Sequence, residues 1–128
     1  MYTEKLIERF RNPKHAGEIK DADATATVGN PVCGDVMNYY MKVNIKDGKE
    51  IIGDIKFKTY GCAAAIASSD VLCELARGKT LEEAKKLSRK DLVNELGGLP
   101  PVKMHCTDLA IKGLRKVIEE YEKKKQGK

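Results

Sequence analysis

Two runs of alternating apolar and polar residues, joined by Asp47-Gly48, constrain the fold of this chain more than any other feature. The first run, VMNYYMKVNI, places five apolar side chains on one face: Met37, Tyr39, Met41, Val43 and Ile45. The second run places three: Ile51, Ile55 and Phe57. Asp-Gly between two such runs is a strong signal for a two-residue hairpin turn. The pattern predicts an antiparallel sheet with one face in water and the other covered.

The remaining segments predict one more strand and several helices around this hairpin. Residues 22–28 alternate in the same way and form the third expected strand, and residues 3–12 before them have a helical pattern. Helical periodicity returns after Tyr60-Gly61 and predicts four helices. The first covers residues 62–77, and the second begins at the capping box of Thr80. The third covers residues 88–96, and the last begins at about Cys106. We therefore predict an α+β fold: a three-stranded antiparallel sheet with one N-terminal helix and C-terminal helices packed on one face. Residues 1–128 form a single domain, with a frayed tail from about residue 122.

Charge and hydropathy restrict the classes of function. The net charge of +5 lies largely in the tail YEKKKQGK, and no basic stripe carries aromatic residues for stacking on bases, which argues against nucleic-acid binding. No apolar stretch is long enough to span a membrane, and the N-terminus lacks the apolar core of a signal peptide. We expect a cytoplasmic protein with no membrane association. In that reducing compartment its four cysteines are better explained by metal binding or reactivity than by disulfides.

Three of the four cysteines stand at the ends of predicted elements. Cys33 lies in a Gly/Pro loop, whereas Cys62 and Cys106 open helices, where the helix dipole favours the thiolate. Asp35 and His105 stand beside them. Three thiolates with an aspartate or a histidine suit Zn²⁺, and the same residues suit an iron–sulfur cluster with one weaker ligand. The ligand types alone leave both alternatives open.

The other reactive residue types have simpler explanations. Cys73 lies eleven residues beyond Cys62, about 16 Å further along one helix, so it belongs to no shared centre and is interpreted as structural. His15 is interpreted as an ordinary loop residue. A hydrolase that used Cys106 and His105 as a catalytic pair is the weakest interpretation, because such pairs usually meet through the fold. It also leaves Cys33 and Cys62 unexplained.

LPPVK, residues Leu99, Pro100, Pro101, Val102 and Lys103, precedes the last helix. Its two prolines predict an extended segment. The segment is either a linker between helices or a peptide offered to the groove of a partner.

The motifs together resemble the IscU-type iron–sulfur cluster assembly scaffold, which is related to the N-terminal domain of NifU. The resemblance covers almost the whole chain through NPKHAG, VGNPVCGDVM, FKTYGCAAAIASSD, GKTLEEA and LPPVKMHC, in that order. Ala63-Ala64 replaces the Gly-Ser that is frequent in the family. The related SufU branch has an insertion that this chain lacks and tends to lack the histidine that this chain has at position 105, so the IscU type is favoured.

The resemblance implies the site and its function. Cys33, Cys62 and Cys106 match the cluster cysteines, Asp35 matches an aspartate associated with keeping the cluster labile, and His105 matches a histidine near the site. LPPVK matches the segment that Hsp70-type chaperones, working with J-type partners, recognise when the cluster is released. The implied partners are a cysteine desulfurase and apo iron–sulfur proteins, with a homodimer as one form of the cluster-loaded protein.

We therefore predict a scaffold, not an enzyme, that assembles a [2Fe–2S] cluster from Fe²⁺ and desulfurase-derived sulfur. Cys106 is the predicted persulfide acceptor, with His105 assisting proton transfer, and Asp35 or His105 is the fourth ligand. The alternative is a zinc-dependent sulfur-transfer protein of the SufU kind, with Zn²⁺ in the same site.

Overall fold

The predicted hairpin forms the centre of the fold in the computed structural model, which describes residues 2–30 and 35–126. Strands β2 (Asp35–Lys46) and β3 (Lys49–Thr59) pair antiparallel, with Lys46 opposite Lys49. The two residues between them have positive φ angles, 52° at Asp47 and 76° at Gly48. Both residues of this two-residue turn are therefore in the left-handed region that Asp-Gly tolerates, as the sequence predicts.

Strand β1 (Ala24–Asn30) completes a three-stranded antiparallel sheet in the order β1-β2-β3. The inward side chains of β1 and of the first half of β2 are buried: Ala24, Ala26, Val28, Met37, Tyr39 and Met41. The alternation is confirmed for these residues. It is wrong for Ile45, which is 65% exposed, and Val43 is only partly buried, so the covered face ends before the hairpin turn.

The prediction of which β3 side chains are buried is wrong at one position, because the pairing of β3 with β2 shifts by one residue. Lys42 lies opposite Asp54, but its neighbour Val43 lies opposite Ile52, which leaves Gly53 as an extra residue in β3. A bulge of this kind reverses the side-chain alternation beyond it. Ile52, and not the expected Ile51, is therefore fully buried.

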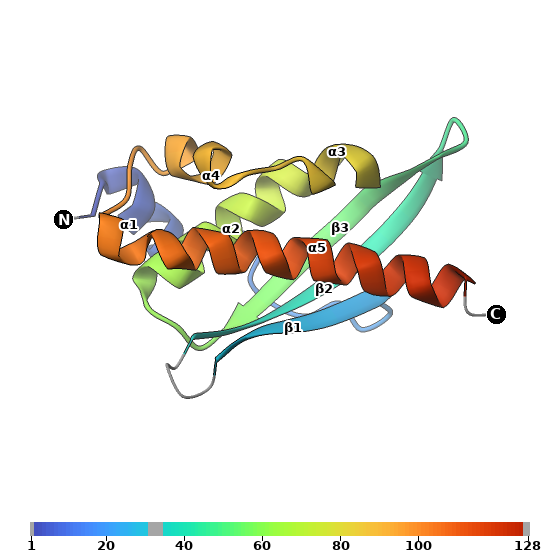
Figure 1. Cartoon of the computed structure of the whole chain (residues 1–128), viewed down its shortest axis with the longest axis horizontal. Coiled ribbons are helices and arrows are strands. Elements are labelled where there is room, and N and C mark those ends of the chain that lie inside the picture. The colour runs from blue at the N-terminus through green and yellow to red at the C-terminus, as the bar shows by residue number, and fades with distance from the viewer. Residues whose placement is uncertain (1, 31–34, 127–128) are drawn as a thin grey trace.

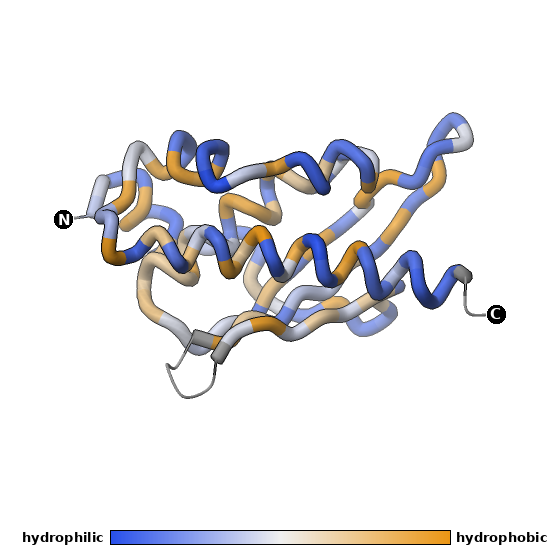
Figure 2. Tube along the Cα trace, viewed as in Figure 1, coloured by the Kyte–Doolittle hydropathy of each residue, from blue (hydrophilic) through white to orange (hydrophobic). Residues whose placement is uncertain are grey.

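Helices cover one face of the sheet, which confirms the α+β prediction (Figure 1). Helix α5 (Met104–Gln126) runs over β1 and β2, and α2 (Ala63–Ala76) lies beside it over β3. Helix α1 (Glu4–Arg11) packs on α2, and the short helices α3 (Leu81–Lys85) and α4 (Arg89–Glu95) contact α5. Figure 2 shows that α2 is hydrophobic along most of its length, whereas the end of α5 is hydrophilic.

Local signals set the helix boundaries. Thr3 caps α1 by accepting from the amide of Leu6, and Thr80 and Glu83 form the predicted capping box of α3. Gly78, with φ of 87°, follows the end of α2, where a left-handed residue can stop a helix.

Helix α5 continues to Gln126, past the point near residue 122 at which the sequence suggests fraying. The ammonium group of Lys124 donates to the carbonyl of Asp23, and Lys125 and Tyr121 both donate to Glu50. These bonds hold the last turns against the ends of the strands. In the part of the chain that is described, no helix is both long and apolar enough to cross a membrane.

Candidate metal centre

The candidate ligands lie where elements begin, at one end of the molecule. The starts of α2 and α5 and the end of β3 meet at the left of Figure 1. Cys62 is the N-cap residue of α2, and His105 and Cys106 lie in the first turn of α5. The sequence prediction for α5 was late by two residues, since the helix begins at Met104.

Two of the five predicted ligands cannot be placed. Cys33 lies outside the described residues, and so does the side chain of Asp35. The backbone of Asp35 begins β2 opposite Asn30, and its neighbour Val36 accepts a hydrogen bond from the amide of Tyr60. The chain just before Cys62 and the start of β2 are therefore close to each other.

Cys62 and Cys106 come together although 44 positions separate them in the sequence. Their sulfur atoms are 3.8 Å apart, and no disulfide joins them. Two sulfur atoms bonded at about 2.3 Å to one tetrahedral metal ion also lie about 3.8 Å apart. The pair therefore has the spacing of two ligands of a single metal ion.

The two thiols differ in exposure. Cys106 is fully buried, whereas Cys62 is partly exposed. The thiol of Cys62 makes no capping hydrogen bond to α2. Tyr60, two residues earlier, is 73% exposed. The site is thus approached from the side of Cys62.

His105 is oriented by a backbone carbonyl. Its Nδ1 lies 3.2 Å from the carbonyl oxygen of Val102, and its Nε2 lies 3.6 Å from the sulfur of Cys106. Because a carbonyl oxygen only accepts, Nδ1 carries the proton of a neutral ring and the lone pair of Nε2 faces the thiol. A nitrogen and a sulfur bound to one tetrahedral metal ion would be separated by a similar distance, about 3.6 Å.

The described residues alone do not complete a metal site. No group of three or more histidine, cysteine, aspartate or glutamate side chains within residues 2–30 and 35–126 is arranged to hold a metal ion. Cys106 lies close to Cys62 and to His105. A full ligand set needs a contribution from another residue or a rearrangement of these three.

Cys73 is separate from this site. It is fully buried in α2, and burial raises the pKa of its thiol well above the ordinary value. A thiol that stays protonated is neither a nucleophile nor a metal ligand. The position of Cys73 agrees with the structural role expected from the sequence.

The LPPVK segment is only partly extended, so the sequence expectation for it was wrong. Pro100 has the extended angles φ −57° and ψ 138°, but residues Pro101–Lys103 form one turn of 3₁₀ helix that leads into α5. Pro101 occupies the first position of this turn, where the missing amide hydrogen of proline breaks no hydrogen bond. Val102 is 77% exposed.

His15 has a structural role that the sequence did not indicate. It is buried, its amide donates to Asp70 at 2.7 Å, and its carbonyl accepts from the amide of Phe57. Asp70 also accepts from Arg9 at 2.9 Å. This buried carboxylate on α2 joins α1 and the segment after it to the core.

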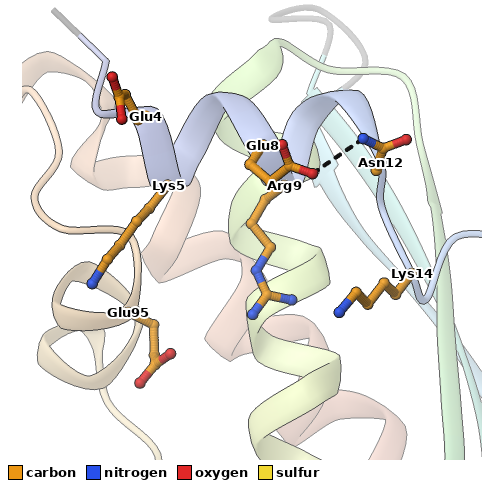
Figure 3. Close-up of a pocket in the computed structure, with 7 residues that line it drawn as sticks. All are labelled: Glu4, Lys5, Glu8, Arg9, Asn12, Lys14 and Glu95. Atoms are coloured by element: carbon orange, nitrogen blue, oxygen red, sulfur yellow. Dashed lines mark hydrogen bonds between the residues drawn. The ribbon is translucent and has the colours of Figure 1, made fainter.

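A second cleft, between α1 and α4, has a mixed lining of acidic and basic side chains (Figure 3). The guanidinium of Arg9 in this cleft is already paired with Asp70 and Glu74, and its hydrogen bond lowers the pKa of Glu74. The remaining charges have both signs, so the cleft favours neither an anion nor a cation. It offers no alternative to the thiol site.

Comparisons with known proteins agree on one family. The model of the NifU-like N terminal domain matches residues 1–128. The chain is 53% identical to the iron–sulfur cluster assembly scaffold protein IscU 1 of Archaeoglobus fulgidus, over 97% of this chain and 78% of that protein. It is 42% identical to the scaffold protein IscU of Escherichia coli K12, over 99% and 98% of the two chains.

Solved structures share the fold. A SUF-system protein from Fervidobacterium islandicum AW-1 superposes with a TM-score of 0.70 at 24% identity, over 91% of this chain and 96% of that one. A NifU-like N-terminal protein from Brucella abortus gives 0.67 at 23% identity, over 95% and 94%. At these identities the similarity concerns the fold alone.

Proposed function

Because this chain belongs to the family of NifU-like N-terminal domains, we propose that Cys33, Cys62 and Cys106 hold a [2Fe–2S] cluster while it is being assembled. The chain is an IscU-type scaffold for iron–sulfur cluster assembly. The cluster is its cargo and is passed on to recipient proteins.

The separation of 3.8 Å between the sulfur atoms of Cys62 and Cys106 carries this proposal. Iron–sulfur clusters are usually held by cysteine thiolates. The pair already has the spacing that one tetrahedral metal ion requires. Cys33 completes the sulfur ligands, and Asp35 or His105 supplies the fourth. An oxygen or nitrogen ligand at the fourth position holds the cluster less firmly than a thiolate, which suits a cluster that is passed on to another protein.

Sulfur arrives on Cys106 as a persulfide from a cysteine desulfurase. The thiol proton of Cys106 moves to the Nε2 lone pair of His105, 3.6 Å from the sulfur. The resulting thiolate attacks the outer sulfur of the donor persulfide, a new S–S bond forms on Cys106, and the donor cysteine leaves as a thiolate. The scaffold then reacts stoichiometrically and has no turnover of its own.

The other proposed partners follow from exposed features and from the scaffold role. Recipients are apo iron–sulfur proteins, and two cluster-loaded chains forming a homodimer is a further proposal. The exposed Val102 and Pro101 of the LPPVK segment support recognition by an Hsp70-type chaperone. A cytoplasmic location stays a prediction.

The experiment that tests the function is anaerobic reconstitution. We expect protein incubated with iron, cysteine and a desulfurase to gain near-stoichiometric iron and acid-labile sulfide, together with sulfur-to-iron charge-transfer absorption. Cys33→Ser, Cys62→Ser and Cys106→Ser should each lose both, whereas Cys73→Ala, which changes a buried thiol outside the site, should keep them.

The opposite outcome is equally specific. One tightly held zinc ion per chain, with no sulfide and no colour after the same incubation, would contradict the cluster assignment. It would favour zinc-dependent sulfur transfer, because Zn²⁺ accepts the same ligands.

A further inference from the structure

The outer edge of β3 is covered by other segments along most of its length. The amide of Ile52 donates to the carbonyl of Lys79, and the carbonyl of Ile52 accepts from Gly78. Further along, the side chain of Asp54 accepts from the amide of Ile55. An open strand edge can pair with a strand of another protein, and these contacts prevent such pairing along this part of β3.

Near its end, the edge is paired with a short parallel segment. The amide of Phe57 donates to the carbonyl of His15, and the amide of Gly17 donates to the carbonyl of Phe57. Gly17 has a φ of 137°, a conformation that turns the chain away from the strand. The covering segment therefore ends at Phe57.

Thr59 is the next residue whose backbone faces this edge. Along a strand, the backbone N–H and C=O groups of successive residues point alternately to the two neighbouring edges. The amide of Tyr60 donates to β2, so the N–H and C=O groups of Thr59 point to the outer edge. On that edge, no backbone hydrogen bond joins Thr59 to any residue that the structure describes. Three residues before Cys62, one donor and one acceptor are thus left without a partner among residues 2–30 and 35–126.

A largely apolar pocket of about 360 Å³ lies at this open position. Its lining comes from the covering segment, the end of β3 and α2, and includes Pro13, Ala16, Phe57, Tyr60 and Ile66. Tyr60 is among the most exposed large hydrophobic side chains that are described. Tyrosine is enriched where proteins bind each other.

The opposite face of the same strand end is basic. Lys56 and Lys58 point to the uncovered face of the sheet, away from the buried Phe57. Lys58 is paired with Glu18 at 2.7 Å, whereas Lys56 has no ion pair with any described residue. The ammonium group of Lys56 therefore complements a carboxylate.

We propose that the Thr59 end of β3 is a docking edge for an extended segment of a partner protein. The segment adds to the sheet through the backbone of Thr59 and places an apolar side chain in the pocket. On its other face it presents a carboxylate to Lys56. This is strand addition, in which backbone bonds give affinity and alternate side chains give specificity. The inference goes beyond the cluster function, because it uses no thiol and no metal.

The test uses the full chain without metal, isotope-labelled for NMR. The probe is a short peptide of alternating leucine and glutamate, acetylated and amidated at its ends. We expect the amide signals of Phe57, Thr59, Tyr60 and Ile66 to shift. The same peptide methylated on alternate backbone nitrogens should not bind, because it cannot pair with a strand edge.

Two variants with a matched control locate the site. Thr59→Pro removes the outward N–H group and should weaken binding about fivefold, the effect of one lost hydrogen bond. Thr59→Val is its control, since both variants lose the hydroxyl bond to the carbonyl of Val36 but valine keeps the N–H. Ala16→Phe fills the pocket without changing the sequence of β3 and should also weaken peptide binding. It tests the proposal if Thr59→Pro does not fold.

Three results would overturn the proposal: signal shifts confined to another surface, equal binding by the methylated peptide, or equal binding by Ala16→Phe and the unaltered chain. Self-association of the chain through this edge, in place of peptide binding, would also contradict it. Cluster assembly is measured separately on the same preparations, so failure of the docking edge is distinguishable from failure of the scaffold function.

Discussion

At the scale of single residues, the proposed role of His105 is to take the thiol proton of its neighbour Cys106. The carbonyl of Val102 holds the proton on Nδ1, so Nε2 is left to accept the thiol proton. His105→Gln keeps a polar side chain but cannot act as a base. We expect persulfide transfer to Cys106 at neutral pH to slow at least about tenfold, since general bases contribute that much or more.

The measurement follows Cys106 persulfide by mass spectrometry after addition of a small persulfide donor, over a range of pH. The deficit should shrink as the pH rises, because hydroxide then takes the thiol proton in place of the histidine. His15→Gln is the control, because His15 makes its described hydrogen bonds through its backbone. Equal rates for the His105→Gln variant and the unaltered chain at neutral pH would remove His105 from the mechanism.

Asp35 supports a second prediction at this scale. If its oxygen is the weak ligand, Asp35→Ala should lengthen the lifetime of the assembled cluster in air, because a more labile bond is lost. The decay of charge-transfer absorption measures this lifetime. Asp21→Ala, at a carboxylate that is 82% exposed, is the control. A lifetime that is unchanged or shorter would assign Asp35 another role.

Elements that depend on neighbouring residues could be predicted from the sequence, and those that depend on distant pairing could not. Asp47-Gly48 and the Thr80–Glu83 capping box contain their own signals. The bulge at Gly53 arises from the register of a partner strand, and the burial of His15 arises from Asp70, 55 positions away. The same reasoning applies to the site. The positions of the cysteines at the ends of predicted elements made them candidate ligands, but only the fold brings the sulfur atom of Cys62 to 3.8 Å from that of Cys106.

The packing of α5 on the sheet gives a prediction at the scale of elements. A Cβ atom at Gly113 would lie 2.3 Å from the ring of Tyr39. That ring is fully buried, and its hydroxyl is hydrogen-bonded to Ser69 at 2.9 Å, so it has little room to retreat. Gly113→Ala should therefore lower the free energy of unfolding by about 1–3 kcal/mol through overpacking.

This outcome opposes helix propensity, which favours alanine over glycine by about 1 kcal/mol in a helix. Urea unfolding measures the difference. Lys112→Ala, at the exposed neighbouring position, is the control and should change stability by less than about 0.5 kcal/mol. A Gly113→Ala variant as stable as the unaltered chain would show that α5 can move away from the sheet.

At the scale of the whole molecule, the candidate ligands lie at one end of the buried core. The sheet and helices α2 and α5 supply a buried centre, while the candidate ligands stand at the starts of α2 and α5 (Figure 1). These two starts are distant in sequence and are joined by no disulfide within the described residues. A bound metal ion would fasten them to each other, so occupancy and stability should be linked.

Zn²⁺ tests this linkage without requiring cluster assembly. A ligand that binds only the folded state at a hundred times its dissociation constant adds about 2.7 kcal/mol, which raises the unfolding midpoint of a domain of this size by roughly 10 °C. Thermal unfolding should show this increase in the unaltered chain and in Cys73→Ala, and a chelator should reverse it. Cys62→Ser and Cys106→Ser should each lose most of it, because each removes one of the paired thiols. If Cys62→Ser kept the full increase, the zinc ion would be bound elsewhere, and the pair would not join the two helices in the metal-bound state.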